Sequence, residues 1–258
     1  MTATFEFTRA LVRTPSQSVT QGLRAETGEG PTHDGVAREH AAYVAALKAA
    51  GVIVDRLPAL EAFPDSVFIE DPALVFADFA ILLRPGAPSR FGEAATVAPA
   101  LAERFDTVLT LDEGYVDGGD VLDLGDRVLI GLSARTDKIG AERLAALLAR
   151  QSRRSEIVAT PPGVLHFKSD CSLVDHETVL SSPRLASAVF FRGMRVIEAA
   201  ADEAGAANAL RVNGDLLLGK RHRRTAQRLG EVAARLVPLE TDEIARLDAG
   251  LSCLSLRW

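Results

Sequence analysis

The sequence predicts an α/β fold arranged as a five-bladed propeller, in which one structural unit is repeated around a ring. Five segments share a pattern of a polar or acidic start and two β-rich runs around a turn, and they begin roughly 40–50 residues apart. Alanine-rich stretches with helical spacing occupy the gaps. No glycine-rich phosphate-binding motif follows a strand, so these observations favour the propeller over a nucleotide-binding parallel sheet.

The paired β-rich runs define the repeated unit. In each pair, aliphatic and β-branched residues flank a short polar turn. Asn213-Gly214 is the strongest of these turns, because this dipeptide favours the tight turn of a β-hairpin. We therefore predict hairpins within residues 70–83, 119–131, 170–180 and 208–218.

The fifth unit is incomplete at the C-terminal end of the sequence. Its β-rich run, Ser252–Leu256, has no partner strand after it. The N-terminal run Phe7–Val12 is the expected partner, which would bring the two ends of the sequence together and close the ring. We find no linker or low-complexity tract, so we predict a single domain over residues 1–258.

Four stretches between the hairpins carry apolar residues at helical spacing, and Gly51 is a fitting stop for the first of them. A glycine-rich segment, Thr27–Asp34, is the one long loop, and such loops often act as lids over a site. The predicted helices are Val36–Ala49, Glu93–Phe105, Lys138–Ala149 and Thr225–Leu236.

Composition and charge exclude several classes of protein. Of the 258 residues, 47% are hydrophobic and 25% are charged, which is ample for a buried core. The net charge of −6 argues against a nucleic-acid partner, which requires a basic surface. The N-terminus lacks an apolar signal-peptide core, and the run Phe76–Leu83 is too short to cross a bilayer. Two cysteines do not make a disulfide framework, so we expect a protein of the reducing cytoplasm, without a membrane segment.

Two side chains are candidates for covalent and acid–base chemistry. Cys253 lies at the start of the last β-rich run, beside Gly250 and Ser252, where a thiol could face a cavity. His166 alone among the five histidines lies in a β-rich run just before a repeated unit, which suits a general acid or base. Most free cysteines, and most lone histidines in apolar runs, are core residues, so both interpretations stay open at this point.

Acidic and basic side chains gather around the repeated units. Carboxylates beside β-rich runs, with no basic partner nearby in the sequence, would suit a cationic ligand and above all a planar guanidinium. Turn capping is an equal alternative, and it is the favoured one for Asp120. Arg90 and Arg135 each follow a hairpin and could bind a substrate carboxylate, although most arginines are solvated surface residues. No metal-binding spacing is present. The carboxylates concerned are Asp65, Glu70, Asp71 and Asp117.

Six motifs together span nearly the whole chain, and they are Phe63–Asp71, Arg84–Arg90, Asp117–Leu122, Gly131–Thr136, Leu165–Ser169 and Leu251–Ser255. In this order they resemble the motifs of the dimethylarginine dimethylaminohydrolases. That family belongs to the guanidino-group-modifying enzymes with the pentein fold, a five-bladed α/β propeller, which agrees with the repeat described above.

The resemblance implies hydrolysis of Nω-methylated L-arginine (asymmetric dimethylarginine or monomethylarginine) to L-citrulline and dimethylamine or methylamine, without cofactor or metal. Carried over by motif, Cys253 would attack the guanidinium carbon to form a thiouronium intermediate, and His166 would carry the proton. Asp71 and Asp117 would hold the guanidinium nitrogens, and Glu70 would line the pocket.

The resemblance also implies how the amino-acid end of the substrate is held. Asp65, together with backbone groups near Leu23 and Leu247, would bind the α-amino group. Arg90 and Arg135 would hold the α-carboxylate. The loop that carries Leu23 would close over the substrate.

Three alternatives remain at the level of the sequence. An arginine deiminase or an amidinotransferase would use a similar site, although deiminases that resemble this set usually carry a helical insertion for which this chain has no room. A non-catalytic pentein-fold protein would need neither Cys253 nor His166. A binding protein for arginine derivatives would bind them without forming citrulline. The sequence does not fix the oligomeric state, and a homodimer is compatible with it.

Overall fold

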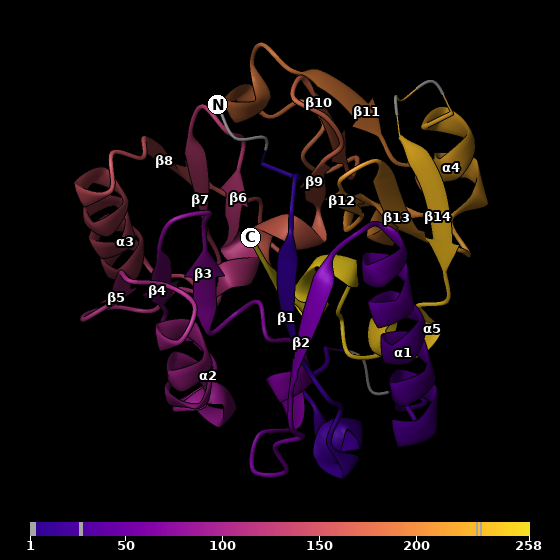
Figure 1. Ribbon diagram of the computed structural model, residues 1–258. Helices are drawn as coiled ribbons and strands as arrows, with labels where there is room; N and C mark the ends of the chain where they lie inside the picture. The colour runs from indigo at the N-terminus through magenta and orange to yellow at the C-terminus, as the bar shows by residue number, and fades with distance from the viewer. Residues whose placement is uncertain (1–3, 26–27, 231, 233) are drawn as a thin grey trace.

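The computed structural model describes residues 4–25, 28–230, 232 and 234–258. Its strands form five three-stranded sheets, which follow one another around a common centre (Figure 1). Helices and irregular segments connect them on the outside of this ring. The predicted five-bladed α/β propeller is therefore confirmed.

Four of the sheets combine a predicted hairpin with a third strand. The two hairpin strands are antiparallel, and the third strand runs parallel to the second. In chain order the strands are β3 (Ala73–Val75), β4 (Ala80–Leu82) and β5 (Val108–Thr110); β6 (Val121–Asp123), β7 (Val128–Leu132) and β8 (Ser155–Ala159); β9 (Cys171–Leu173), β10 (Thr178–Ser181) and β11 (Arg195–Glu198); β12 (Leu210–Val212), β13 (Asp215–Gly219) and β14 (Arg235–Leu239).

The fifth sheet joins the two ends of the described chain. β1 (Arg9–Arg13) lies in its middle, parallel to β2 (Ile53–Leu57) and antiparallel to β15 (Leu256–Arg257). Leu11 pairs with Leu256 in this sheet. The predicted closure of the ring is confirmed, although the C-terminal strand begins at Leu256 rather than at Ser252.

Burial explains why the hairpins were predicted and the third strands were not. Every residue of β10 and of β13 is buried, so these strands stand out as continuous apolar runs. In β2 and β8 most positions are exposed or half-buried, and polar residues interrupt the pattern. Short runs of that kind carry little periodicity from which a strand can be recognised.

The hydrophobic core consists of five clusters, each between one sheet and the next around the ring. The cluster between the fifth and first sheets, for example, packs Leu11 and Leu256 against Ala73 and Ala80. The other four clusters join the remaining neighbours in the same way. Every sheet thus buries both of its faces against neighbours, which fixes the sheets rigidly around the centre.

Three of the four predicted helices are present over most of their length. Thr32 caps α1, because its Oγ1 accepts a hydrogen bond from the Gly35 N–H, so this helix begins at His33 inside the predicted loop. The fourth helix prediction is wrong at its C-terminal end, since α4 ends at Arg228 and the predicted helical residues Arg235 and Leu236 belong to β14. Thr27 of the predicted lid and residues 231 and 233 of that helix lie outside the described residues. The α-helices are α1 (His33–Ala49), α2 (Glu93–Ala102), α3 (Lys138–Arg150), α4 (Arg223–Arg228) and α5 (Asp242–Ala245).

A short 3-10 helix precedes the strand that opens each blade, and these turns position the site. Most of the residues proposed for catalysis lie in or directly beside these turns, as described below. The five are η2 (Pro64–Val67) before β3, η4 (Gly118–Asp120) before β6, η5 (Phe167–Ser169) before β9, η7 (Ala204–Ala207) before β12 and η8 (Leu251–Leu254) before β15. Across the described residues, every helix is too short or too polar to cross a membrane.

Candidate active site

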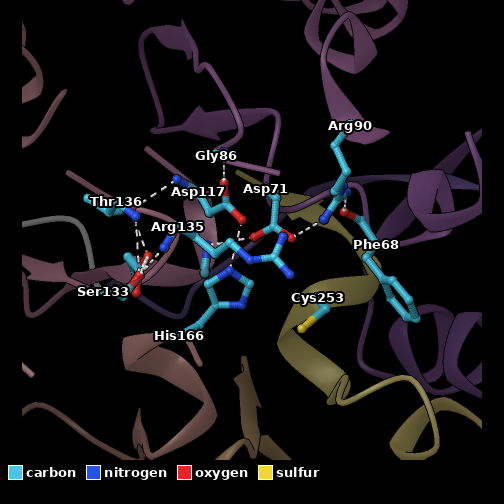
Figure 2. A network of polar contacts seen from close by, with 12 residues as sticks. Phe68, Asp71, Gly86, Arg90, Asp117, Ser133, Arg135, Thr136, His166 and Cys253 are labelled. Atoms are coloured by element: carbon cyan, nitrogen blue, oxygen red, sulfur yellow. Dashed lines mark hydrogen bonds and ion pairs between the residues drawn. The ribbon is translucent and has the colours of Figure 1, made fainter. Parts of the chain in front are cut away.

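A cavity of about 250 Å³ brings together eight of the ten residues predicted for the site. They come from segments that span the chain from residue 23 to residue 253. Figure 2 shows the Cys253 sulfur turned toward the group formed by His166, Asp71 and Arg135. The eight lining residues are Leu23, Asp65, Asp71, Arg90, Arg135, His166, Leu247 and Cys253.

The sequence indicated that Cys253 lies at the start of a strand. In the structure it lies in the 3-10 helix η8. Its backbone N–H donates to the Gly250 carbonyl at 3.3 Å, and its residue surface is 9% exposed. Burial raises the pKa of the thiol to about 12, and the carboxylates of Glu70 and Asp71 contribute in the same direction. At neutral pH the resting thiol is therefore protonated.

His166 is the N-cap residue of η5 and has an extended backbone, which directs its ring into the cavity. Its Nε2 lies 2.8 Å from Oδ2 of Asp117. Burial alone would lower the pKa of the imidazole, but the charge of Asp71 and the hydrogen bond to Asp117 outweigh it and raise the pKa to about 9. The ring is thus an imidazolium at neutral pH and can donate a proton.

Asp117 holds this imidazolium in place from below the surface of the cavity. Its side chain is fully buried, and its Oδ1 accepts a hydrogen bond of 2.7 Å from the Gly86 N–H. Its own backbone N–H donates to Thr136 Oγ1. One carboxylate oxygen therefore faces His166 while the other is fixed to the backbone of a different segment, so the orientation of the His166 ring is defined.

Asp71 is the carboxylate that faces both the cavity and the buried Arg90. Its Oδ1 accepts a hydrogen bond of 2.9 Å from the Gly119 N–H, and its Oδ2 pairs with the Arg90 guanidinium. Burial would raise the pKa of this carboxyl, but Arg90 and His166 keep it below its ordinary value. A side-chain Cβ at Gly119 would lie 2.9 Å from the His166 ring, so glycine is needed where the backbone approaches both groups.

Arg90 is more deeply embedded than a simple ligand-binding arginine. It forms a two-point contact with Glu93, at 3.0 and 2.7 Å, and donates to the Phe68 carbonyl at 2.9 Å. Together with the pair to Asp71, these bonds hold its guanidinium in one orientation. Arg135, in contrast, is half-buried, and its loop is fixed through the bond from its backbone N–H to Ser133 Oγ.

Asp65 connects the cavity to the N-terminal loop. Its Oδ1 accepts a hydrogen bond of 2.9 Å from the Leu23 N–H. Burial raises the pKa of this carboxyl, while Arg90 opposes the shift. A Cβ at Gly22 would lie 2.9 Å from the same oxygen, so the loop reaches this position through a glycine. Leu247 lines the cavity beside Leu23.

Comparison with known proteins places the chain in a family. A sequence profile described as arginine deiminase matches residues 98–255. An N(G),N(G)-dimethylarginine dimethylaminohydrolase from Pseudomonas aeruginosa is 33% identical over 98% of this chain and 100% of its own length. The protein of the same name from Streptomyces coelicolor is 35% identical over 96% of each chain. This chain belongs to the dimethylarginine dimethylaminohydrolase family.

Solved structures of dimethylarginine dimethylaminohydrolases share the fold over nearly its full length. The Pseudomonas aeruginosa enzyme, as a cysteine-to-serine mutant in complex with citrulline, superposes with a TM-score of 0.96 at 32% identity and covers 98% of this chain and 100% of its own. A histidine-to-glycine variant in an adduct with S-methyl-L-thiocitrulline gives a TM-score of 0.95 at 32% identity, with the same coverage. The family inferred from the six motifs is confirmed.

Glu70 differs from what the family resemblance implied. It lines a second cavity together with Ser252, whereas Asp71 and Cys253 line the first. Its carboxylate accepts from Ser252 Oγ at 2.9 Å and pairs with Lys168 at 2.7 Å and Arg257 at 3.1 Å. Because neighbouring residues in this segment face different cavities, Glu70 supports the turn that carries the nucleophile and does not line the cavity shared by eight of the predicted residues.

Asp120, which the sequence assigned to turn capping, links two segments of the candidate site. It is buried, and it accepts hydrogen bonds from Ser133 Oγ, Thr136 Oγ1 and the Phe167 N–H at 2.7, 2.6 and 2.8 Å. It therefore ties the loop of Arg135 to the segment of His166 across two blades. The Asp117-Gly118-Gly119-Asp120 motif marks Asp120 in the sequence, but it does not reveal the distant residues to which Asp120 is hydrogen-bonded.

Three groups of the site could also offer ligands to a metal ion. Asp71, Asp117 and His166 each present a donor atom, and these atoms lie within 4.8 Å of one another. In the described chain the same atoms already form the His166–Asp117 hydrogen bond, and Asp71 pairs with Arg90. An ion would have to replace those interactions, whereas a guanidinium can add to the outward-facing carboxylate of Asp71 without doing so.

Proposed function

We propose that the protein hydrolyses Nω-methylated L-arginine to L-citrulline and a methylamine through a covalent intermediate on Cys253. The observation that carries this proposal is the shared cavity of a thiol, an imidazolium and a buried carboxylate that faces it. Membership of the dimethylargininase family supports it, as do the citrulline and thiocitrulline ligands of two relatives.

Substrate binding follows from the charges around the cavity. The guanidinium would lie against Asp71, whose depressed pKa keeps it ionised. Arg135, the less constrained of the two arginines, would meet the α-carboxylate, with Arg90 contributing its positive charge from below. The α-amino group would lie near Asp65 and the backbone of Leu23 and Leu247.

Substrate binding would itself activate the nucleophile. Burial and two carboxylates keep the resting Cys253 thiol neutral. A guanidinium placed beside the sulfur adds positive charge, so it lowers the pKa of the thiol and favours the thiolate. The thiol proton passes to solvent, and it does so only when there is a substrate to attack, which protects the free enzyme from side reactions.

The reaction then balances with His166 as the proton carrier. The thiolate attacks the guanidinium carbon and forms a C–S bond, and the C–N bond to the methylated nitrogen breaks as His166 gives that nitrogen its proton. The amine leaves, and a thiouronium remains on Cys253. The neutral imidazole then takes one proton from water, whose oxygen attacks the same carbon. Cleavage of the C–S bond expels the Cys253 sulfur, which takes the remaining hydroxyl proton, so citrulline is released and the thiol and the imidazolium are restored.

A colorimetric citrulline assay with asymmetric dimethylarginine, monomethylarginine and arginine tests this proposal. We expect citrulline from at least one methylated arginine, at a higher kcat/KM than from arginine. Preference for arginine would instead assign the protein to the deiminases, which the matching family profile also describes. If all three compounds bind but no citrulline forms, the protein is a binding protein for arginine derivatives and not a hydrolase.

The cellular setting is a further part of the proposal. We propose a reducing, cytoplasmic location, because Cys253 has to stay a free thiol to act as a nucleophile. The net charge of −6 supports the absence of a nucleic-acid partner. A homodimer remains compatible with the chain, and light scattering on the purified protein distinguishes it from a monomer.

A further inference from the structure

Asn208 lies beside the 3-10 helix of the fourth blade, and in the other blades the residues in or beside the corresponding 3-10 helices supply polar groups of the site. It is the C-cap residue of η7 and is 9% exposed. In the other blades Asp65 lies in η2, Asp117 and His166 are the N-caps of η4 and η5, and Cys253 lies in η8. The family motifs assign no role to the η7 turn, so Asn208 is the polar side chain at this fifth position.

The Asn208 amide contacts the nucleophile's turn with both of its ends. Its Oδ1 accepts a hydrogen bond of 3.1 Å from the Ser252 N–H, and its Nδ2 lies 3.9 Å from the Cys253 sulfur. A backbone N–H can only donate, so the end of the amide that faces Ser252 has to be the oxygen. The NH₂ group is thereby directed at the sulfur.

Gly250 shows how closely the turn is fitted to this amide. A Cβ at Gly250 would lie 2.2 Å from Asn208 Cγ, 2.5 Å from Oδ1 and 2.6 Å from Nδ2. The glycine is required by this approach of backbone to side chain, since its φ of −133° is open to any residue. Residues 250–253 therefore wrap around the Asn208 side chain.

The charges around Cys253 favour a neutral hydrogen-bond donor over a cation as the group that stabilises its thiolate. Glu70 and Asp71 raise the pKa of the thiol and Lys168 lowers it, while the protonated His166 lines the same cavity. A further cation beside the sulfur would favour the thiolate but would repel a guanidinium substrate. An amide N–H stabilises the thiolate by hydrogen bonding without adding a charge that competes with the substrate.

We propose that Asn208 is a positioning residue that fixes the turn of Cys253 and donates a hydrogen bond to its thiolate. The part of this inference that concerns turnover rests on the proposed function, whereas the contact with the thiolate does not. The two ends of the Asn208 amide thus have separate roles. The oxygen fixes the backbone at Ser252, and the NH₂ group stabilises the thiolate of Cys253.

The experiment replaces Asn208 by aspartate and follows alkylation of Cys253 by iodoacetamide between pH 7 and pH 10, in a Cys171→Ala background. Asn208→Asp keeps an oxygen for the Ser252 N–H but replaces the donor near the sulfur with an acceptor. We expect alkylation to slow roughly tenfold or more at every pH in this range, because a lost hydrogen bond to a charged group raises the pKa of the thiol. With a methylated arginine as substrate, kcat should fall while KM changes little.

Asn213→Asp is the matched control in the same blade. Asn213 donates through Nδ2 to the carbonyls of Phe7 and Ala50, so the change removes half-buried donors without altering a contact of Cys253. Its alkylation profile should equal that of the Cys171→Ala parent. An unchanged profile in Asn208→Asp, or an equal shift in Asn213→Asp, would overturn the inference. Alkylation needs no substrate, so this outcome is independent of whether methylated arginines are turned over.

Discussion

The two cysteines of this chain lie in comparable places in two blades and differ in almost everything that decides reactivity. Cys171 begins β9 directly after η5, and Cys253 lies in η8 just before β15. Both are buried, and burial raises the pKa of both thiols. Burial and an elevated pKa therefore do not by themselves separate an inert cysteine from a nucleophile.

The surroundings of the two sulfurs make the difference. Cys171 is fully buried in a hydrophobic cluster with Phe167, Leu173 and Val179, and its Sγ donates to the Phe167 carbonyl at 3.3 Å. The surface of this residue is 0% exposed, so its thiol does not contact solvent. Cys253 lines a cavity that has room for a cation, and two of the causes of its high pKa are carboxylates that such a cation would neutralise. A nucleophile can thus be held inactive by interactions that its own substrate cancels.

The largest expected effect separates the two thiols directly. Cys253→Ser should lower kcat with methylated arginine by more than roughly a thousandfold, because an alcohol is far harder to ionise than a thiol. Cys171→Ala should keep its activity and lose about 1 kcal/mol in the free energy of unfolding, which denaturant titration measures. Full activity of Cys253→Ser would show that this thiol is not the nucleophile, and a comparable loss in Cys171→Ala would remove the contrast between the two thiols.

The next effect concerns the imidazole that faces only one of the two thiols. His166→Ala should slow turnover by roughly a hundredfold to ten-thousandfold, because both the proton donor and the later base are lost. Mass spectrometry after incubation with substrate should find any trapped adduct on the peptide of Cys253 and none on that of Cys171. Full activity of this variant would remove His166 from the mechanism.

Without substrate, the pH dependence of alkylation should sharpen the contrast. Since the pKa of Cys253 is about 12, its thiolate fraction, and hence its alkylation rate, should rise about tenfold per pH unit between pH 7 and pH 10. Cys171 should stay unmodified until the protein is unfolded, because its residue surface is 0% exposed. A plateau for Cys253 near pH 8 would mean that the resting site already stabilises the thiolate.

The smallest expected effect is on stability as a function of pH. The pKa of His166 is raised from its ordinary value of 6.5 to about 9, so the folded state binds its proton more tightly than the unfolded state. This stabilisation is complete below pH 6.5 and should disappear as the pH rises through 9. Melting temperatures measured across that interval should fall for the parent protein and fall less for His166→Ala. Cys171→Ala should follow the parent.

The sequence predicted those parts of the fold whose pattern is local. Apolar hairpins such as β12–β13, with their Asn213-Gly214 turn, are visible because both faces are buried. The outer strands were missed because they are short and half-exposed. The helix predicted over Thr225–Leu236 failed at its C-terminal end because Arg235 and Leu236 belong to β14 and pair with β13, and that pairing across the blade overrides the local helical spacing.

For the site, the sequence identified the reactive side chains but not the residues of other blades that contact them. Motifs indicated Cys253 and His166, because thiol and imidazole stand out against their neighbours. Asp120 and Asn208 act on residues of other blades, and no local pattern announces such contacts. The different directions of Glu70 and Asp71 follow from an irregular segment whose path only the packed ring determines.

The seam between β1 and β15 has a consequence for how the protein is made. Its contacts join residues as far apart in the chain as Thr8 and Trp258, so four blades can emerge from the ribosome before this last pairing can form. His166 and Asp117 belong to the blades that are synthesised first, while Cys253 belongs to the blade that is completed last. We expect the newly synthesised chain to pass through an inactive intermediate in which the ring is open. We expect activity to appear when β1 pairs with β15, and this pairing to be the slow step of folding.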